Sequence, residues 1–218
     1  MASPSRYQLN SSALRSEGFV YVEDSALGQE VEKLQKIGFP LRTQVGLQFC
    51  RQSVLEDERV QPVLRSFFDA PCLGIYHSYS CDPDHTYTFM KKEGSDPPAL
   101  VIHLFTPETR ILLFERSQLQ TFKTWHASNG MLEVANAALR KANIMAKEVV
   151  LNHGGLVIAD TRLCFRTMAG DAIIAIFADK EGEEIKTWDK IELQKVDNLE
   201  QEVAEMERSG IWTNFTYA

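Results

Sequence analysis

The sequence lacks several features that mark particular classes of protein. Its four cysteines (Cys50, Cys72, Cys81 and Cys164) include no CxxC pair, which argues against zinc knuckles and disulfide scaffolds. Free thiols in a reducing cytosol are expected instead. No apolar run approaches the roughly 20 residues that cross a bilayer, and the opening residues MASPSRYQLNSS lack the apolar core of a signal peptide. We therefore expect a cytoplasmic protein without a membrane partner.

Clusters of lysine and arginine are also missing. The chain has 23 Lys and Arg residues against 30 Asp and Glu residues, and a net charge of −7. Because nucleic-acid phosphates are bound by clustered cations, this balance argues against a nucleic-acid partner. The length of 218 residues, with 44% hydrophobic and 10% aromatic residues, is enough for one packed domain.

The order of predicted elements indicates a mainly β protein with flanking helices. Helices are expected within about 1–70, where DSALGQEVEKLQKIG has Asp24 or Ser25 as its cap and Pro62 must kink or split a later helix. From residue 72 onward about eight short strands follow, interrupted by one helix in NGMLEVANAALRKANI. A helix over about 197–209, capped by Asp197, closes the chain. This order predicts a single α+β domain over 1–218, built as an antiparallel sandwich or jelly roll.

Three stretches of the sequence carry a resemblance to a known family. They are LRSEGFVYVED, ILLFERSQL and HGGLVIADTRLCFRT. In the second, Arg116–Gln118 stands where the family has Gly-Ser-His, and in the third, Asp160–Leu163 is in step with the family pattern. Together they resemble the iron- and 2-oxoglutarate-dependent oxygenases, in particular the phytanoyl-CoA dioxygenase-like branch. The resemblance implies a double-stranded β-helix (jelly roll).

The chain departs from that family at the residues that bind iron and 2-oxoglutarate. Such oxygenases hold iron with a His-X-Asp/Glu pair and a distal His. The resemblance places Phe165 at the distal position, and no His-X-Asp or His-X-Glu triplet occurs in the sequence. The strand that usually carries an arginine for the 2-oxoglutarate carboxylate is 170–177 here, and it has neither Arg nor Lys. No catalytic, cofactor-binding or metal-binding residue is therefore expected on this chain.

These departures imply a non-catalytic member of an oxygenase family. The resemblance suggests a subunit that stabilises or completes the active site of a homologous catalytic oxygenase, as a heterodimer, with self-association as a homodimer the other possibility. Iron(II) and 2-oxoglutarate would then be bound by the partner. Heterodimers of this kind resemble tailoring enzymes of fungal natural-product pathways, which points to terpenoid-type secondary metabolism.

Two further interpretations of the sequence stay open. One is an active oxygenase or isomerase with a rewired metal site made of His77, Asp84 and His103. Against it, residues 81–84 (Cys-Asp-Pro-Asp) have the composition of a β-turn, and a histidine within the apolar run ALVIHLFT is more often a hydrogen-bonded core residue. The other is a small-molecule-binding barrel that has no partner.

Three residues of the stretch HGGLVIADTRLCFRT are expected to have structural roles. Asp160 and Arg162 are two positions apart, so on a strand their side chains would lie on the same face. We expect them to form an ion pair at a hairpin end. Cys164 lies in an apolar strand and is expected to be a small buried hydrophobic residue.

Overall fold

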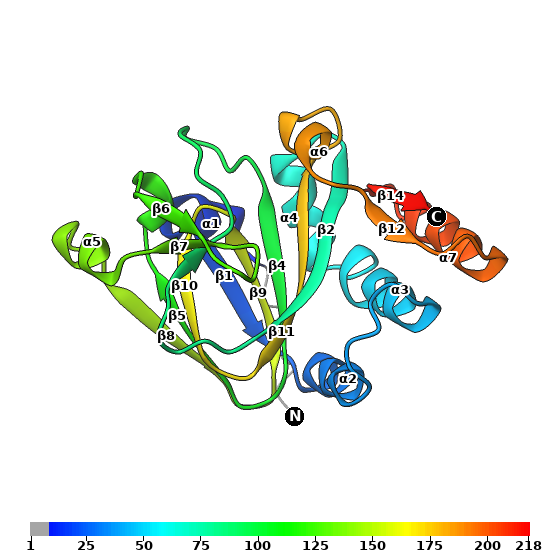
Figure 1. Ribbon diagram of the computed structural model, residues 1–218, viewed down its shortest axis with the longest axis horizontal. Helices are drawn as coiled ribbons and strands as arrows, with labels where there is room; N and C mark the ends of the chain where they lie inside the picture. Colours follow the sequence, from blue (N-terminus) through cyan, green and yellow to red (C-terminus); the bar gives the residue numbers. More distant parts are fainter. Residues whose placement is uncertain (1–8) are drawn as a thin grey trace, which may run out of the picture.

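The chain folds into two facing six-stranded β-sheets with helices on their outer sides, as seen in the computed structural model, which describes residues 9–218 (Figure 1). The first sheet has the order β1 (Phe19–Glu23), β9 (Gly155–Asp160), β4 (Leu100–Phe105), β11 (Asp171–Asp179), β2 (Pro71–Ser80) and β13 (Trp212–Thr213). The second has the order β6 (Thr124–His126), β7 (Leu132–Val134), β3 (Tyr87–Thr88), β10 (Cys164–Ala169), β5 (Thr109–Phe114) and β8 (Ala146–Leu151). Within both sheets the described neighbours are antiparallel, apart from the parallel pair of β13 and β2.

The core lies in two layers because side chains alternate along each strand. On β4, Val101 and Phe105 face the second sheet, whereas Leu100, Ile102 and Leu104 face the helices. All six residues of β4 are buried, as expected for a strand that has neighbours on both sides and is covered on both faces. Phe165, at the position that the resemblance assigns to the distal iron ligand, packs in the layer between the sheets.

Helices cover the outer face of the first sheet. They are α1 (Ser11–Glu17), α2 (Ser25–Lys36), α3 (Gln44–Cys50), a π-helix (Arg51–Leu55), α4 (Val60–Phe67) and α7 (Asp197–Glu207). Figure 1 shows α2, α3 and α7 grouped beyond β2 and β11, next to the parallel pair β12 (Ile191–Leu193) and β14 (Phe215–Tyr217). Their apolar faces share one core cluster with the sheet, so burial against the sheet stabilises these short helices.

The remaining helices lie over other parts of the sandwich. A 3₁₀ turn (Ser117–Leu119) and α5 (Asn136–Lys141) belong to the excursion between β5 and β8, and Leu139 of α5 packs in a third core cluster with Phe114 and Cys164. The helix α6 (Glu183–Thr187) contacts β11 and β2. Within residues 9–218, no helix has the length and apolar character needed to cross a membrane.

The structure confirms the predicted mainly β architecture with flanking helices. The N-terminal helices expected within about 1–70 are present from Ser11 to Phe67, with β1 between the first two, and the first eight residues lie outside the described part. The C-terminal helix spans Asp197–Glu207 rather than 197–209. Asp197 is not its cap: Val196 holds that position, and the Asp197 carboxylate lies in the first turn without a capping hydrogen bond.

Candidate functional site

Phe165 lies in β10 at the centre of an aromatic cluster between the two sheets. Its ring stacks on Phe89 at a centroid distance of 5.2 Å and meets the edge of His103, also at 5.2 Å. The cluster consists of Tyr79, Tyr87, Phe89, His103, Phe105 and Phe165. Such offset and edge contacts between rings contribute about 0.5–1.5 kcal/mol each beyond burial. The position that the resemblance assigns to a distal metal ligand is thus occupied by tightly packed rings.

His103 is a hydrogen-bonded core residue, as expected. Its side chain is buried in β4, and Nδ1 lies 2.9 Å from the Tyr79 hydroxyl. Thr167 donates to the same hydroxyl at 3.4 Å. Burial lowers the pKa of His103 to about 3 and raises the pKa of Tyr79. The imidazole is therefore neutral at neutral pH and too weakly basic to act as a general base there.

The proposed alternative metal ligands are not brought together. His77 and His103 lie on strands on either side of β11, both in register with Ile174, and the His77 side chain is exposed. Asp84 lies in the exposed loop after β2. Among residues 9–218, no three His, Cys, Asp or Glu side chains form a group that could hold a metal ion. The residues present therefore do not fit the iron centre that the resemblance implies.

Asp82, which lies in the β-turn that the sequence predicts at residues 81–84, joins two aromatic side chains. It accepts a 2.6 Å hydrogen bond from the Tyr87 hydroxyl and lies 2.9 Å from Nδ1 of His85. Burial acts to raise the pKa of Asp82, but the bonds from Tyr87 and His85 outweigh it and the pKa is lowered. The turn after β2 is thereby attached to the aromatic cluster through Tyr87. In the sequence, this contact is indicated only by spacing: Asp82 lies three residues before His85 and five residues before Tyr87.

Asp160 and Arg162 form the structural ion pair that the sequence predicts. Both side chains are buried, with exposed fractions of 2% and 3%, and the guanidinium binds the carboxylate through Nε and Nη2 at 3.0 and 2.7 Å. The third nitrogen, Nη1, donates to the Gly94 carbonyl at 2.7 Å. The pair therefore joins the turn between β9 and β10 to the loop between β3 and β4.

The segment Arg116–Gln118, which stands where the family has Gly-Ser-His, begins in a left-handed backbone conformation. Arg116 has φ of 65°, in the left-handed region that favours the glycine found there in the family. The Ser117 hydroxyl accepts a 2.8 Å hydrogen bond from the backbone N–H of Cys164, which is buried as predicted. Gln118 stands in place of histidine, and both polar atoms of its buried amide lack a hydrogen-bond partner among the described residues.

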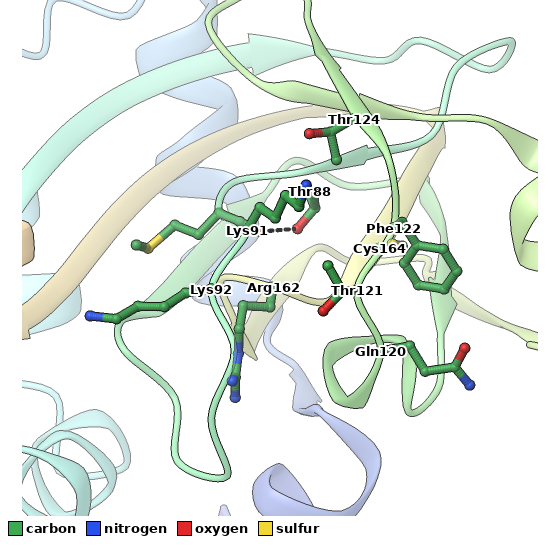
Figure 2. A pocket seen from close by; sticks show the side chains of 10 residues that line it. Thr88, Lys91, Lys92, Gln120, Thr121, Phe122, Thr124, Arg162 and Cys164 are labelled. Carbon is green, nitrogen blue, oxygen red and sulfur yellow. Dashed lines mark hydrogen bonds between the residues drawn. The ribbon is translucent and has the colours of Figure 1, made fainter.

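A small polar pocket lies outside the aromatic cluster, where three chain segments meet (Figure 2). It is lined by Thr88, Met90, Lys91, Lys92, Gln120, Thr121, Phe122, Thr124, Arg162 and Cys164. The room between these residues is about 20 Å³, which is space for roughly one water molecule. The pocket was not predicted from the sequence, although residues 116–132 contain no acidic residue in an otherwise acidic chain.

Comparison with known proteins assigns a fold class but no family. No family model matches the chain, and no curated protein matches it in sequence. Among solved structures, AviO1 from Streptomyces viridochromogenes Tue57 is 13% identical and superposes with a TM-score of 0.52 over 84% of this chain and 98% of AviO1. HygX from Streptomyces hygroscopicus, solved with iron bound, is 11% identical, with a TM-score of 0.54 over 90% and 94% of the two chains.

A third structure connects this fold to 2-oxoglutarate chemistry. SnoN, a non-heme alpha ketoglutarate dependent epimerase from nogalamycin biosynthesis, was solved with Fe³⁺, alpha ketoglutarate and nogalamycin RO. It is 13% identical, with a TM-score of 0.56 over 78% of this chain and 82% of SnoN. The chain thus has the fold of proteins that include iron- and 2-oxoglutarate-dependent enzymes. At these identities the similarity is one of fold.

Proposed function

We propose that the chain is a non-catalytic subunit that stabilises, or completes the active site of, a homologous iron- and 2-oxoglutarate-dependent oxygenase. The observation that carries this proposal is the packing of Phe165 against Phe89 and His103, where the resemblance places a distal iron ligand. A phenyl ring has no lone pair to donate to a metal. The strand β11, which would supply the carboxylate-binding arginine, carries neither Arg nor Lys between Asp171 and Asp179.

We also infer that the sandwich is a double-stranded β-helix of the phytanoyl-CoA dioxygenase-like type. The strand order supports this classification, because β2, β4, β9 and β11 belong to one sheet and β3, β5, β8 and β10 to the other. Chain segments that alternate in this way between two antiparallel sheets are typical of jelly rolls. The left-handed Arg116 and the buried pair of Asp160 and Arg162 agree with the family pattern in that branch.

The proposed partner is a catalytic homologue that binds iron(II) and 2-oxoglutarate, in a cytoplasmic heterodimer of fungal terpenoid-type secondary metabolism. The place of SnoN in nogalamycin biosynthesis supports a natural-product setting for this fold. Self-association into a homodimer is the second possible assembly. The partner and the pathway are inferred from the resemblance, and the proposed loss of metal binding is inferred from the residues around Phe165.

The first experiment asks whether the chain binds iron at all. Protein purified without oxygen is titrated with iron(II), bound metal is measured by elemental analysis, and succinate formation from 2-oxoglutarate is followed. HygX, which binds iron in its crystal structure, is the positive control. We expect no stoichiometric iron and no succinate. One iron per chain that is lost in His77→Ala would instead establish the rewired metal site.

The second experiment tests the subunit role. The neighbouring genes are searched for a catalytic homologue, the chain is produced alone and together with that homologue, and both preparations are analysed by sedimentation velocity. We expect a stoichiometric complex, and higher oxygenase activity or stability of the homologue within it. A stable monomer that forms no complex with the homologue contradicts the subunit role and leaves the small-molecule-binding barrel as the better explanation.

A further inference from the structure

We propose that the open edge of β1 pairs with the same edge of a second copy of this chain, so that the two first sheets join across a twofold axis. β1 stands at the end of the strand order of its sheet, and among residues 9–218 its only strand partner is β9. Pairing of an open strand edge with another chain is a common mode of association. The inference concerns copies of this chain and does not depend on the proposed subunit role.

Three residues of β1 direct their backbone groups away from β9. The Gly18 carbonyl accepts a 2.9 Å hydrogen bond from the backbone N–H of Asp160. Because the direction of bonding alternates along an antiparallel strand, every second residue counted from Gly18 bonds to β9. The N–H and C=O groups of Phe19, Tyr21 and Glu23 therefore lie along the free edge, and no backbone hydrogen bond from another residue within 9–218 reaches them. A further strand can bond to these groups.

The edge of β1 lacks the features that usually protect an exposed strand. Its sequence, FVYVE, contains no proline or lysine, Glu23 is its only charged residue, and its register with β9 has no bulge. By contrast, the edge strand β8 carries Lys147 and Glu148, and the edge strands β6 and β13 have only three and two residues. Since natural sheets protect their edges with charges, prolines, bulges or short strands, the edge of β1 is the one best suited to pairing.

An open groove lies along this edge and reaches both faces of the strand. On the helix side, Leu9 and Val20 line the groove and pack against the core beneath the helices. On the other side Lys147 covers the strand, with Nζ 5.3 Å from the ring centroid of Phe19 and 5.9 Å from that of Tyr21. The groove has room of about 210 Å³, which is enough for a side chain of an added strand.

A twofold axis at Tyr21 gives a self-complementary register. Antiparallel pairing then sets Tyr21 opposite Tyr21 of the second copy, and each of these side chains is 42% exposed in the single chain. Val20 lies opposite Val22 of the second copy, which places an aliphatic side chain in the apolar part of the groove. Phe19 lies opposite Glu23 of the second copy. Cross-strand pairs of aromatic and of β-branched residues stabilise a sheet, so the register favours association.

The same register brings opposite charges together. Side chains of alternate residues share a face of the strand, so Glu23 of the second copy lies on the face where Lys147 covers the Phe19 ring. Within one chain, Nζ of Lys147 lies 3.6 Å from Glu115 and 4.0 Å from Glu17, at contacts that are exposed to solvent. The contact between Glu23 and Lys147 occurs twice in the dimer, once on each side of the axis. This charge complementarity identifies a second copy as the occupant of the edge.

The first test is sedimentation velocity of the full chain between about 5 and 500 μM. Pairing of two five-residue strands buries less surface than the roughly 800 Å² per partner of a stable complex, so we expect a weak dimer with a Kd on the order of tens of micromolar. Tyr21→Pro removes an N–H that only the added strand uses and should raise the Kd at least about tenfold. Tyr217→Ala is the control, because it removes an exposed aromatic ring of β14, which is not part of the first sheet; its Kd should equal that of the wild type.

The second test exchanges the charges between copies. Glu23→Lys and Lys147→Glu should each raise the Kd at least about tenfold, because like charges then face each other across the axis. An equal mixture of the two variants should associate as the wild type does, because both contacts of the mixed dimer again join a lysine to a glutamate. A substitution that only disturbed its own chain would not be rescued by the other variant.

Three results overturn the proposal. They are a wild type that stays monomeric up to about 500 μM, a Kd that is unchanged in folded Tyr21→Pro, and a mixture of the charge variants that associates no more than either variant alone. Tyr21, Glu23 and Lys147 are all exposed, and circular dichroism will show whether each variant is folded. If Tyr21→Pro does not fold, the mixture of the charge variants decides the question.

Discussion

The ring of Phe165 stacks on the ring of Phe89, with centroids 5.2 Å apart and planes inclined by 20°. Phe165 comes from β10, and Phe89 directly follows β3, so the contact bridges two segments far apart in the sequence. His103 approaches the same ring from the facing sheet. The position that the resemblance assigns to a distal metal ligand is therefore part of the hydrophobic core.

Replacing Phe165 with alanine should lower the free energy of unfolding by about 3–5 kcal/mol, the usual cost of deleting a buried phenyl ring. The side chain is 2% exposed, so the cavity cannot be filled by solvent. Urea denaturation followed by circular dichroism measures the change. Phe165→Leu, which keeps most of the volume, should cost less than half as much. A loss below about 1 kcal/mol for the alanine variant would show that the interior is not packed around this ring.

Asp160→Asn should be strongly destabilising, by about 3–5 kcal/mol, because it leaves the buried Arg162 guanidinium without its counter-charge. The exposed pair of Arg110 and Glu148 is a matched control, since its side chains are 54% and 44% exposed. Glu148→Gln should change the free energy of unfolding by less than about 1 kcal/mol. Equal effects of the two substitutions, measured by urea denaturation, would contradict the role assigned to burial.

The sequence predicted the architecture well where local signals agree with packing. Asp24 caps α2 as one of the two predicted candidates, accepting from the backbone N–H groups of Ala26 and Leu27. Pro62 was expected to kink or split a helix. The helix is indeed split, since the π-helix ends at Leu55 and α4 begins at Val60. Pro62 therefore lies in the first turn of α4, where its missing N–H removes no hydrogen bond within the helix.

Other features depend on contacts that no local pattern contains. Aspartate is a common N-cap residue, so Asp197 was expected to cap the last helix. The helix already includes Asp197, however, and Val196 is its N-cap. The attachment of Asp82 to Tyr87 requires the conformation of the loop between β2 and β3. The pocket at Lys91 requires three distant segments to meet. His103 was placed correctly in the core, but its Tyr79 partner lies 24 residues away on another strand.

Gly74 is predicted to be intolerant of substitution because Trp188 lies against its backbone. A Cβ at this position would stand 2.2 Å from Cε3 of Trp188. Gly74→Ala should therefore displace the indole and cost about 1–3 kcal/mol, as expected for overpacking. In the background of Trp188→Ala the same substitution should cost close to nothing. A double-mutant cycle with thermal or urea unfolding measures this coupling, and additive effects would show that the two residues do not compete for space.

The buried His103 should make the protein less stable as the pH falls from about 6.5 toward 3. Burial lowers its pKa to about 3 in the folded state, whereas the unfolded chain binds a proton near pH 6.5. Between these values the unfolded state binds more protons, so the stabilisation is fully present above pH 6.5 and is lost progressively below it. The loss from pH 6.5 to 4.5 should be on the order of 2 kcal/mol. Urea unfolding across this range should show a shallower slope of stability against pH for His103→Gln than for the wild type. Equal slopes for the two proteins would mean that the imidazole is not held neutral by the core.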